Sequence, residues 1–343
     1  MTAATSELLR RLPKAELHVH LDGSLRPATL LELAGERGVA LPVTDPDGLA
    51  RAMLASDAES LEEYLEPFRL TLAVMQDAEA IERIAFELVE DHAAESVRYV
   101  EVRFCPDLCT RGRLTSHEVL DAALAGLARA ARATGTRTSG IVCGLRSLPS
   151  AASLEMAELA VAYGGRGVCA FDLAGAEHGF PVADHVAALR VAHAAGLPVT
   201  IHAGEGFGPR SIRQAIELGR AARIGHGTRL GEDPALLEEV REAGIVLEIC
   251  LTSNVQTRVA ASYETHPLRA FFDQGLRVTL CTDNRLMSGV TLTREYEHAR
   301  DALGFTWEEL VEVARSGFTS AFTPEGVRAD LLRGFADAVT DAV

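Results

Sequence analysis

Eight short apolar segments alternate along the chain with longer segments of helical periodicity, and this alternation constrains the fold more than any other feature. The apolar segments are rich in β-branched residues and are bounded by glycine, proline or polar residues, as buried strands are. They cover residues 16–21, 97–104, 138–145, 168–173, 198–202, 222–225, 245–251 and 276–282. Helical segments between them include residues 115–134, 151–163, 183–195, 211–218 and 234–243. The pattern predicts an α/β fold, a single parallel (β/α)8 barrel of the TIM-barrel type.

An open doubly wound sheet is the alternative to a barrel, and it is less favoured because no G-x-G-x-x-G sequence follows a strand. The stretch between the first two predicted strands is much longer than the other connections. Helical patterns there cover residues 45–53, 61–75 and 78–94. Because this insertion follows the carboxyl end of a strand, we expect segment 45–95 to form a helical lid over the barrel mouth. Leu65 and Phe68 would contact the substrate from it, although ordinary helix packing is an equal alternative for both.

The region from about residue 290 to residue 343 is predicted to add carboxyl-terminal helices. Thr306, followed three positions later by Glu309, is typical of a capping box and predicts a helix that runs through Ala314. No repeat or low-complexity linker marks a second domain. We therefore expect residues 1–343 to form one domain.

The composition excludes several classes of protein. Apolar residues make up 48% of the chain and charged residues 24%, which is typical of a globular protein. The net charge of −16 argues against nucleic acid or an anionic membrane as the main partner. None of the six cysteines forms a C-x-x-C pair, so we expect free thiols. Neither a signal-peptide core nor a run of 18 apolar residues is present, so we expect a cytoplasmic protein.

Two histidines, His18 and His20, stand at the end of the first predicted strand as H-V-H. Alternate residues of a strand point to the same side, so both imidazole rings would face the barrel interior. That arrangement suits two ligands of one metal ion.

Three further polar residues end predicted strands: His202 the fifth, His226 the sixth and Asp283 the eighth. The carboxyl ends of all barrel strands meet at one mouth, so these side chains should gather with His18 and His20. Imidazole and carboxylate ligands suit Zn²⁺ with a position left for water. A single buried histidine or aspartate is more often a hydrogen-bonded core group than a ligand. Five such residues at strand ends would each need a separate buried hydrogen-bond partner, so a shared metal site is favoured.

We expect one metal ion per chain, because Lys14 precedes the first strand and Asp172 lies inside the fourth, so neither is placed to bridge a second ion. Glu205 follows His202 by three residues, just past the fifth strand. A glutamate in a dry pocket can have a raised pKa and donate a proton at neutral pH. The alternative for Glu205 is a surface glutamate at the start of a helix.

Six segments resemble the adenosine deaminase family of metal-dependent, amidohydrolase-like barrels. They are P-K-A-E-L-H-V-H-L-D-G (13–23), F-D-L-A-G-A-E (171–177), H-A-G-E (202–205), G-H-G (225–227), C-L-T-S-N (250–254) and C-T-D-N (281–284). The resemblance runs in order over about residues 10–325. The H-x-E and P-C-x-x-C pairing of cytidine-type deaminases is absent.

The resemblance implies one Zn²⁺ ion and two catalytic residues. The ligands of the ion would be His18, His20, His202 and Asp283. His226 would orient the attacking water and assist as a base. Glu205 would give a proton to purine N1.

The resemblance also implies which residues contact the substrate; they would be His20, Asp22, Gly175 and Asn284. Asp22 would accept hydrogen bonds from the ribose hydroxyls. The backbone of Gly175 would contact N3, since a residue without a Cβ allows close approach. Asn284 replaces the usual second aspartate, and its amide can donate to N7 at any pH. Cys281 and Ala176 replace the usual asparagine and aspartate, and we attach no function to either change.

The implied reaction is hydrolysis of adenosine, and of 2′-deoxyadenosine, to inosine and ammonia in purine salvage. Relatives act on adenine, AMP, N6-methyl-AMP or 6-amino-deoxyfutalosine, and these alternatives stay open. Asp22 favours a nucleoside, whereas AMP would require a basic cluster, for which Arg146 and Arg210 are the candidates. A non-catalytic metal- or nucleoside-binding relative is an alternative of another class. Such a protein would typically have lost a ligand or the acid, and this sequence retains all of them. The sequence leaves the oligomeric state open.

Overall fold

The strands lie side by side in chain order from β1 to β8 in a computed structural model that describes residues 4–54 and 61–342. They are β1 (Lys14–His20), β2 (Val97–Phe104), β3 (Arg137–Leu145), β4 (Val168–Ala174), β5 (Val199–Ala203), β6 (Arg223–His226), β7 (Val246–Ile249) and β8 (Arg277–Leu280). Each strand pairs in parallel with the next. After β8, the amide of Asp283 donates to the carbonyl of His18 at 2.8 Å, and its carbonyl accepts from the amide of His20 at 2.7 Å. These bonds join the two edges of the sheet, and the predicted (β/α)8 barrel is confirmed.

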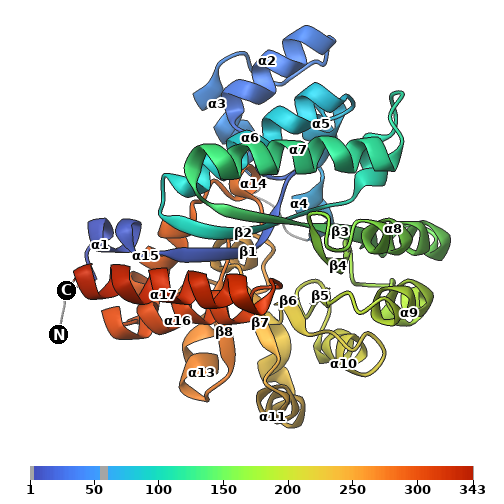
Figure 1. Cartoon of the computed structure of the whole chain (residues 1–343). Helices are drawn as coiled ribbons and strands as arrows, with labels where there is room; N and C mark the ends of the chain where they lie inside the picture. Colours follow the sequence, from blue (N-terminus) through green and yellow to red (C-terminus); the bar gives the residue numbers. More distant parts are fainter. Residues whose placement is uncertain (1–3, 55–60, 343) are drawn as a thin grey trace.

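Helices surround the strands on the outside (Figure 1). Those between β2 and β8 are α7 (Ser116–Thr134), α8 (Ser150–Ala162), α9 (Val186–Ala194), α10 (Pro209–Glu217), α11 (Pro234–Ala243), α12 (Leu251–Gln256) and α13 (Leu268–Asp273). Short 3₁₀ turns lie at η1 (Pro106–Cys109), η2 (Val182–His185) and η3 (Thr228–Glu232). The five helical segments predicted in this part of the chain are therefore confirmed, with small differences at their ends.

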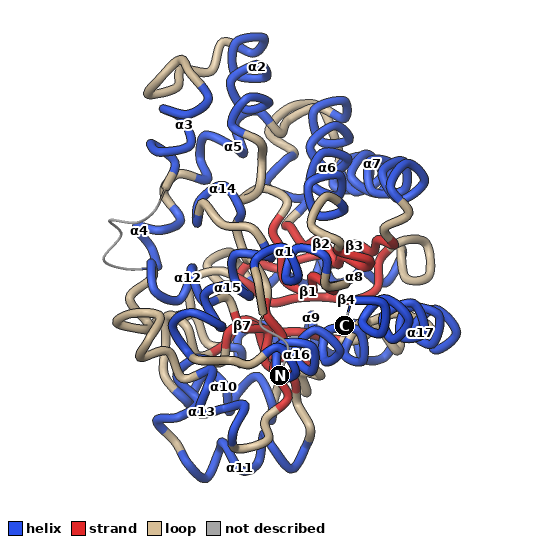
Figure 2. Tube along the Cα trace, turned by 90° about the vertical axis from the view of Figure 1, so that its left-hand side faces the viewer, coloured by secondary structure: helices blue, strands red, loops and turns tan. Residues whose placement is uncertain are grey.

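The insertion between β1 and β2 is helical, as predicted. It contains α2 (Pro27–Arg37), α3 (Pro46–Met53), α4 (Leu61–Leu65), α5 (Phe68–Val74) and α6 (Ala78–Ala93). Figure 2 shows α2 and α3 beyond the strands on one side of the molecule. Segment 61–75 forms two short helices instead of one, and Pro67, which has no amide hydrogen, stands where the second begins. Helix α2 was not predicted, although Pro27 at its start and the left-handed Gly38 at its end are helix boundary signals.

Two predicted strands are longer than the observed ones. The seventh was expected over 245–251 and the eighth over 276–282, whereas β7 ends at Ile249 and β8 at Leu280. The apolar character continues past both strands because Cys250, Leu251 and Cys281 are also buried. A buried loop or helix start therefore has the same composition as a buried strand.

The termini add α1 (Ser6–Arg11), α14 (Arg285–Ser288), α15 (Leu292–Leu303), α16 (Trp307–Ser320) and α17 (Glu325–Ala342). The capping box of Thr306 and Glu309 is confirmed, and its helix runs past Ala314 to Ser320. All six cysteines are free, and five of them are buried. None of the helices in residues 4–54 and 61–342 has both the length and the apolar character of a membrane span.

Charged side chains fill the barrel interior beneath its mouth. Arg103 donates to Asp172 at 3.0 Å and to Glu248 at 2.9 Å. Arg223 lies 2.6 Å from Glu248 and also pairs with Glu101. All five side chains are buried. Removing one partner of such a network leaves a buried charge unpaired, at a cost on the order of 3–5 kcal/mol, so these groups hold one another in place.

Two helical glycines give a matched test of the packing around the barrel. A Cβ at Gly126 in α7 would meet Glu82 O and would lie 2.8 Å from Ala85 Cβ in α6, whereas a Cβ at Gly35 in α2 meets nothing within 4 Å. Gly126→Ala is expected to lower the free energy of unfolding by about 1–3 kcal/mol through overpacking. Gly35→Ala is expected to raise it by about 0.5–1 kcal/mol through helix propensity. Chemical denaturation measures both, and equal effects of the two substitutions would contradict this packing.

Candidate active site

A cavity of about 210 Å³ opens at the carboxyl ends of the strands. One end of it is polar and is lined by His20, Asp22, His202, Glu205, His226, Asp283 and Asn284. The insertion supplies apolar walls through Leu61, Tyr64, Leu65, Phe68 and Leu72 of α4 and α5. Leu65 and Phe68, the two predicted apolar contacts of the substrate, thus line the cavity.

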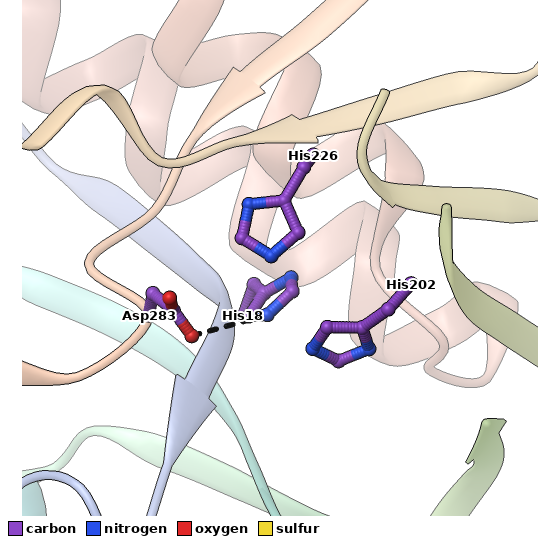
Figure 3. Close-up of side chains that lie close together, drawn as sticks. All are labelled: His18, His202, His226 and Asp283. Carbon is purple, nitrogen blue, oxygen red and sulfur yellow. Dashed lines mark ion pairs between the residues drawn. The ribbon is translucent and has the colours of Figure 1, made fainter. Parts of the chain in front are cut away.

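Five predicted site residues meet at the polar end. One ligand atom from each of His18, His202, His226 and Asp283 lies within 4.8 Å of the others, and their side chains point toward one another in Figure 3. His20 joins them, since its Nε2 is 3.2 Å from Nε2 of His202 and 3.4 Å from Oδ1 of Asp283. The structure therefore brings together all five histidine and aspartate side chains selected from the sequence.

The backbone at two of these residues is in the left-handed region. The φ angles are +64° at His226 and +59° at Asp283. For residues other than glycine this conformation costs about 1–2 kcal/mol, so surrounding contacts must hold it. The carbonyl and amide of Asp283 are fixed by β1, and the Oγ of Ser253 donates to its carboxylate at 2.7 Å.

Two of the histidines are oriented by carboxylates behind them. Nδ1 of His18 lies 2.9 Å from Glu248, and Nδ1 of His202 lies 3.0 Å from Asp172. A carboxylate accepts a hydrogen bond, so each Nδ1 carries a proton, and in the neutral ring Nε2 then has a lone pair directed at the cluster. Asp172 is inside β4, as predicted, and lies behind His202.

The cluster fits a divalent cation. Nε2 of His18 is buried and has no hydrogen-bond partner, although it lies 3.5 Å from Asp283 Oδ1. Burial, the largest cause, lowers the pKa of His20 well below its usual value and also lowers that of His202, which favours the neutral form needed for ligation. Neutral imidazoles with one carboxylate are a donor set suited to Zn²⁺.

Glu205 is buried beside the cluster, and its Oε2 lies 3.4 Å from Nε2 of His226. Burial, followed by the charges of Asp283 and Glu177, raises the pKa of this carboxyl well above its usual range. Its other oxygen, Oε1, has no hydrogen-bond partner. The raised pKa favours the protonated form of Glu205, and that form could donate into the cavity.

The loop that carries Glu205 is held by Glu177, which was not among the predicted site residues. Glu177 accepts hydrogen bonds from the amides of Gly204, Glu205 and Gly206 at 2.9, 2.7 and 2.8 Å. Its place at the end of A-G-A-E, in a segment that carried the family resemblance, was a signal that could have been used. Glu248, which lies behind His18, was missed because it sits inside an apolar strand.

The other predicted substrate contacts also line the cavity. Asp22 is 6% exposed with Oδ1 unpartnered, and burial raises its pKa to about 7. Gly175 has a left-handed φ of +88°, which suits a residue without a Cβ. Oδ1 of Asn284 is also unpartnered. Neither candidate for phosphate binding lines the cavity, since Arg146 is buried and donates to the carbonyls of Phe180 and His202 and Arg210 is exposed on α10.

A parallel barrel that gathers histidines and an aspartate from β1, β5, β6 and the end of β8 at its mouth defines an amidohydrolase-like, metal-dependent class of hydrolase. Residues 13–338 match the model of the adenosine deaminase family. The chain belongs to this family.

Similar proteins agree with this assignment. The chain is 42% identical to an adenosine deaminase of Mycobacterium sp. (strain JLS), with 96% of each protein covered. It is 39% identical to an adenosine deaminase of Clostridium acetobutylicum, with 95% of this chain and 98% of that protein covered.

Solved structures of related proteins have the same fold. An adenine deaminase from Arthrobacter aurescens is 26% identical with a TM-score of 0.89, over 96% of this chain and 99% of that one. An amidohydrolase from Burkhoderia ambifaria with bound Zn is 25% identical with a TM-score of 0.88, over 100% of this chain and 95% of that one.

Asp172→Asn tests the carboxylate behind His202. We expect metal affinity to fall about 10–100-fold, because an amide is a weaker acceptor for the Nδ1 proton of that ring. Glu101→Gln is the matched control, since Glu101 pairs with Arg223 in the same buried network but contacts no site histidine. Both variants should lose stability, and Asp172→Asn alone should lose metal in competition with a chelator. Equal metal affinities in the two variants would contradict the orienting role.

Proposed function

We infer that this chain is an enzyme that hydrolyses adenosine to inosine and ammonia, the reaction that gives its family and its bacterial relatives their name. The observation that carries this conclusion is the convergence of four histidines, one aspartate and a buried glutamate at one end of the cavity. Hydrolysis of a 6-aminopurine requires an activated water and a proton donor close together. This end of the cavity carries groups suited to both tasks.

We propose that one Zn²⁺ ion per chain is held by His18, His20, His202 and Asp283. The carboxylates behind His18 and His202 support this choice, because they leave a lone pair on Nε2 of each ring. The bound Zn in the related amidohydrolase also supports it. When bound, the ion would lower the pKa of a water toward neutrality and so supply the nucleophile.

Glu205 is the proton donor in this proposal, and its raised pKa favours the protonated form. Its proton passes to purine N1 as the water oxygen bonds to C6, which prevents negative charge from accumulating on the ring. The bond between C6 and the amino nitrogen then breaks. One proton of the water leaves with ammonia, and the other replaces the proton that Glu205 delivered.

The remaining polar groups of the cavity would orient the purine nucleoside. The Asn284 amide donates to N7, the Gly175 amide donates to N3, and Asp22 accepts from the ribose hydroxyls. The unpartnered oxygen of Asp22 supports this role. Leu65 and Phe68 would cover the base, and His20 would border it from the metal side. A dry cavity of this kind strengthens each of these polar contacts.

An uncharged nucleoside fits the cavity better than a nucleotide does. The described lining contains no arginine or lysine, whereas it includes Asp22 and Glu205. Residues 1–3, 55–60 and 343, outside the described part, contain no basic residue either. A phosphate such as that of the IMP bound by a related Arabidopsis protein would therefore meet no cation here. 2′-Deoxyadenosine fits the same account, because its remaining hydroxyls can still donate to Asp22.

We further propose that residues 1–343 form one domain, with segment 45–95 as a lid over the mouth. The apolar walls that α4 and α5 contribute to the cavity support this arrangement. We propose that such a deaminase serves purine salvage in the cytoplasm, where its six free cysteines would stay reduced. The net charge of −16 argues against nucleic acid and anionic membranes as partners.

A substrate panel tests this proposal. Adenosine, 2′-deoxyadenosine, adenine and AMP are compared by the change in ultraviolet absorbance on deamination, with and without a chelator. Both nucleosides should react with kcat/KM at least about 100-fold above that of AMP, since a phosphate would be desolvated without a partner. Chelation should abolish turnover. Preference for AMP or adenine would contradict the assigned substrate, and turnover by metal-free protein would contradict the mechanism.

Glu205→Gln tests the proton donor. The variant keeps the size of the side chain but cannot transfer a proton, so we expect kcat for adenosine to fall about 100–10,000-fold. Metal content and binding of inosine should stay close to those of the unsubstituted protein. Near-native turnover in this variant would assign the proton to another group.

A further inference from the structure

A chain of buried hydrogen bonds runs from the start of α13 to the cavity through His266, Asn254 and His226. All three side chains are at most 3% exposed. We propose that His266 and Asn254 are positioning residues that keep the proton of neutral His226 on Nε2. His226 then acts as a hydrogen-bond donor to the attacking oxygen, and neither as its base nor as a metal ligand. This inference rests on the proposed function.

A backbone amide next to His266 determines which group donates and which accepts in this series of hydrogen bonds. The amide of Leu268 donates to Nδ1 of His266 at 3.0 Å. A backbone amide can only donate, so Nδ1 of His266 bears no proton and Nε2 of the neutral ring does. Burial lowers the pKa of His266 to about 3, which keeps this ring neutral.

The next link fixes the orientation of the Asn254 amide. Nε2 of His266 lies 3.2 Å from Oδ1 of Asn254, and the hydroxyl of Thr228 donates to the same oxygen at 2.8 Å. Because His266 is the donor, the oxygen of Asn254 must face it. The NH₂ group of Asn254 therefore faces Nδ1 of His226, at 3.0 Å.

An NH₂ group can only donate, so Nδ1 of His226 is an acceptor. The proton of the neutral ring must then lie on Nε2, which faces the cavity 3.4 Å from Glu205.

The groups behind the three buried histidines divide them into two kinds. His18 and His202 have carboxylates behind Nδ1, which leave Nε2 with a lone pair for a metal ion. His226 has an amide behind Nδ1, which leaves Nε2 with a proton. His226 is close enough to the other side chains to be a metal ligand. However, an Nε2 atom that carries a proton has no lone pair with which to bind a metal ion.

A donor at this position stabilises negative charge on the oxygen as it bonds to C6, in the manner of an oxyanion-hole group. His226 takes up no proton in this step. The protons of the water instead go to the leaving ammonia and to Glu205, as in the proposed reaction.

Asn254→Asp is the direct test, because a carboxylate of the same shape accepts where the amide donates. In metal-loaded full-chain protein with ¹⁵N-labelled histidine, NMR should show His226 protonated on Nε2, with the signal assigned by comparison with His226→Gln. In Asn254→Asp the proton should move to Nδ1. We expect kcat to fall about 100–1,000-fold, the loss typical of one oxyanion donor, with a much smaller change in KM. Gln256→Glu makes the same chemical change two residues along α12 and should leave the tautomer of His226 unchanged.

His266→Phe provides a second variant, which removes a donor to Asn254 without adding charge. It should lower kcat and populate both tautomers of His226, because the amide is then held by Thr228 alone. A proton on Nδ1 in the unsubstituted protein would overturn the proposal, as would an Nε2 proton that persists in both variants. The tautomer is read without substrate, so failure to deaminate adenosine would refute the proposed function separately.

Discussion

The two backbone hydrogen bonds between Asp283 and β1 are the interaction on which the rest of the structure depends. They connect the last strand to the first, and so close the sheet into a barrel. The same bonds set the carboxylate of Asp283 between His18 and His20, because alternate residues of β1 face the interior. A shift of one residue in this pairing would turn the histidines away from the interior. The same contacts therefore close the fold and assemble the site.

The buried ions below the mouth extend this coupling into the core. Arg103 contacts both Asp172 and Glu248, and these two carboxylates orient His202 and His18. Arg103 keeps both carboxylates ionised, and each carboxylate also accepts a hydrogen bond from Nδ1 of its histidine. This places imidazole nitrogens at the centre, next to one carboxylate, where a divalent cation would be stabilised. Bound metal would accordingly stabilise the folded state as well as the reaction.

Much of the fold and of the candidate site was predictable because both follow local rules. Strand periodicity located eight strands, and the position of His18, His202 and Asp283 at strand ends implied that they converge. Strand ends were predicted less well where buried apolar residues such as Leu251 continue into a helix. The hydrogen bonds that connect His266, Asn254 and His226 were not predictable, because they join three separate segments through side chains whose partners no single-sequence pattern reveals. The donor and the acceptor of each hydrogen bond decide which nitrogen of His226 carries the proton, and they can be assigned only from the arrangement of the side chains in the structure.

The central claim is that four particular side chains, and not His226, surround one divalent cation. Anomalous diffraction from crystals loaded with zinc tests it most directly. The account predicts one anomalous peak per chain, bonded to Nε2 of His18, His20 and His202 and to the carboxylate of Asp283, with His226 outside bonding distance. A peak bonded to His226 in place of one of these ligands, or no peak after loading with zinc, would contradict it.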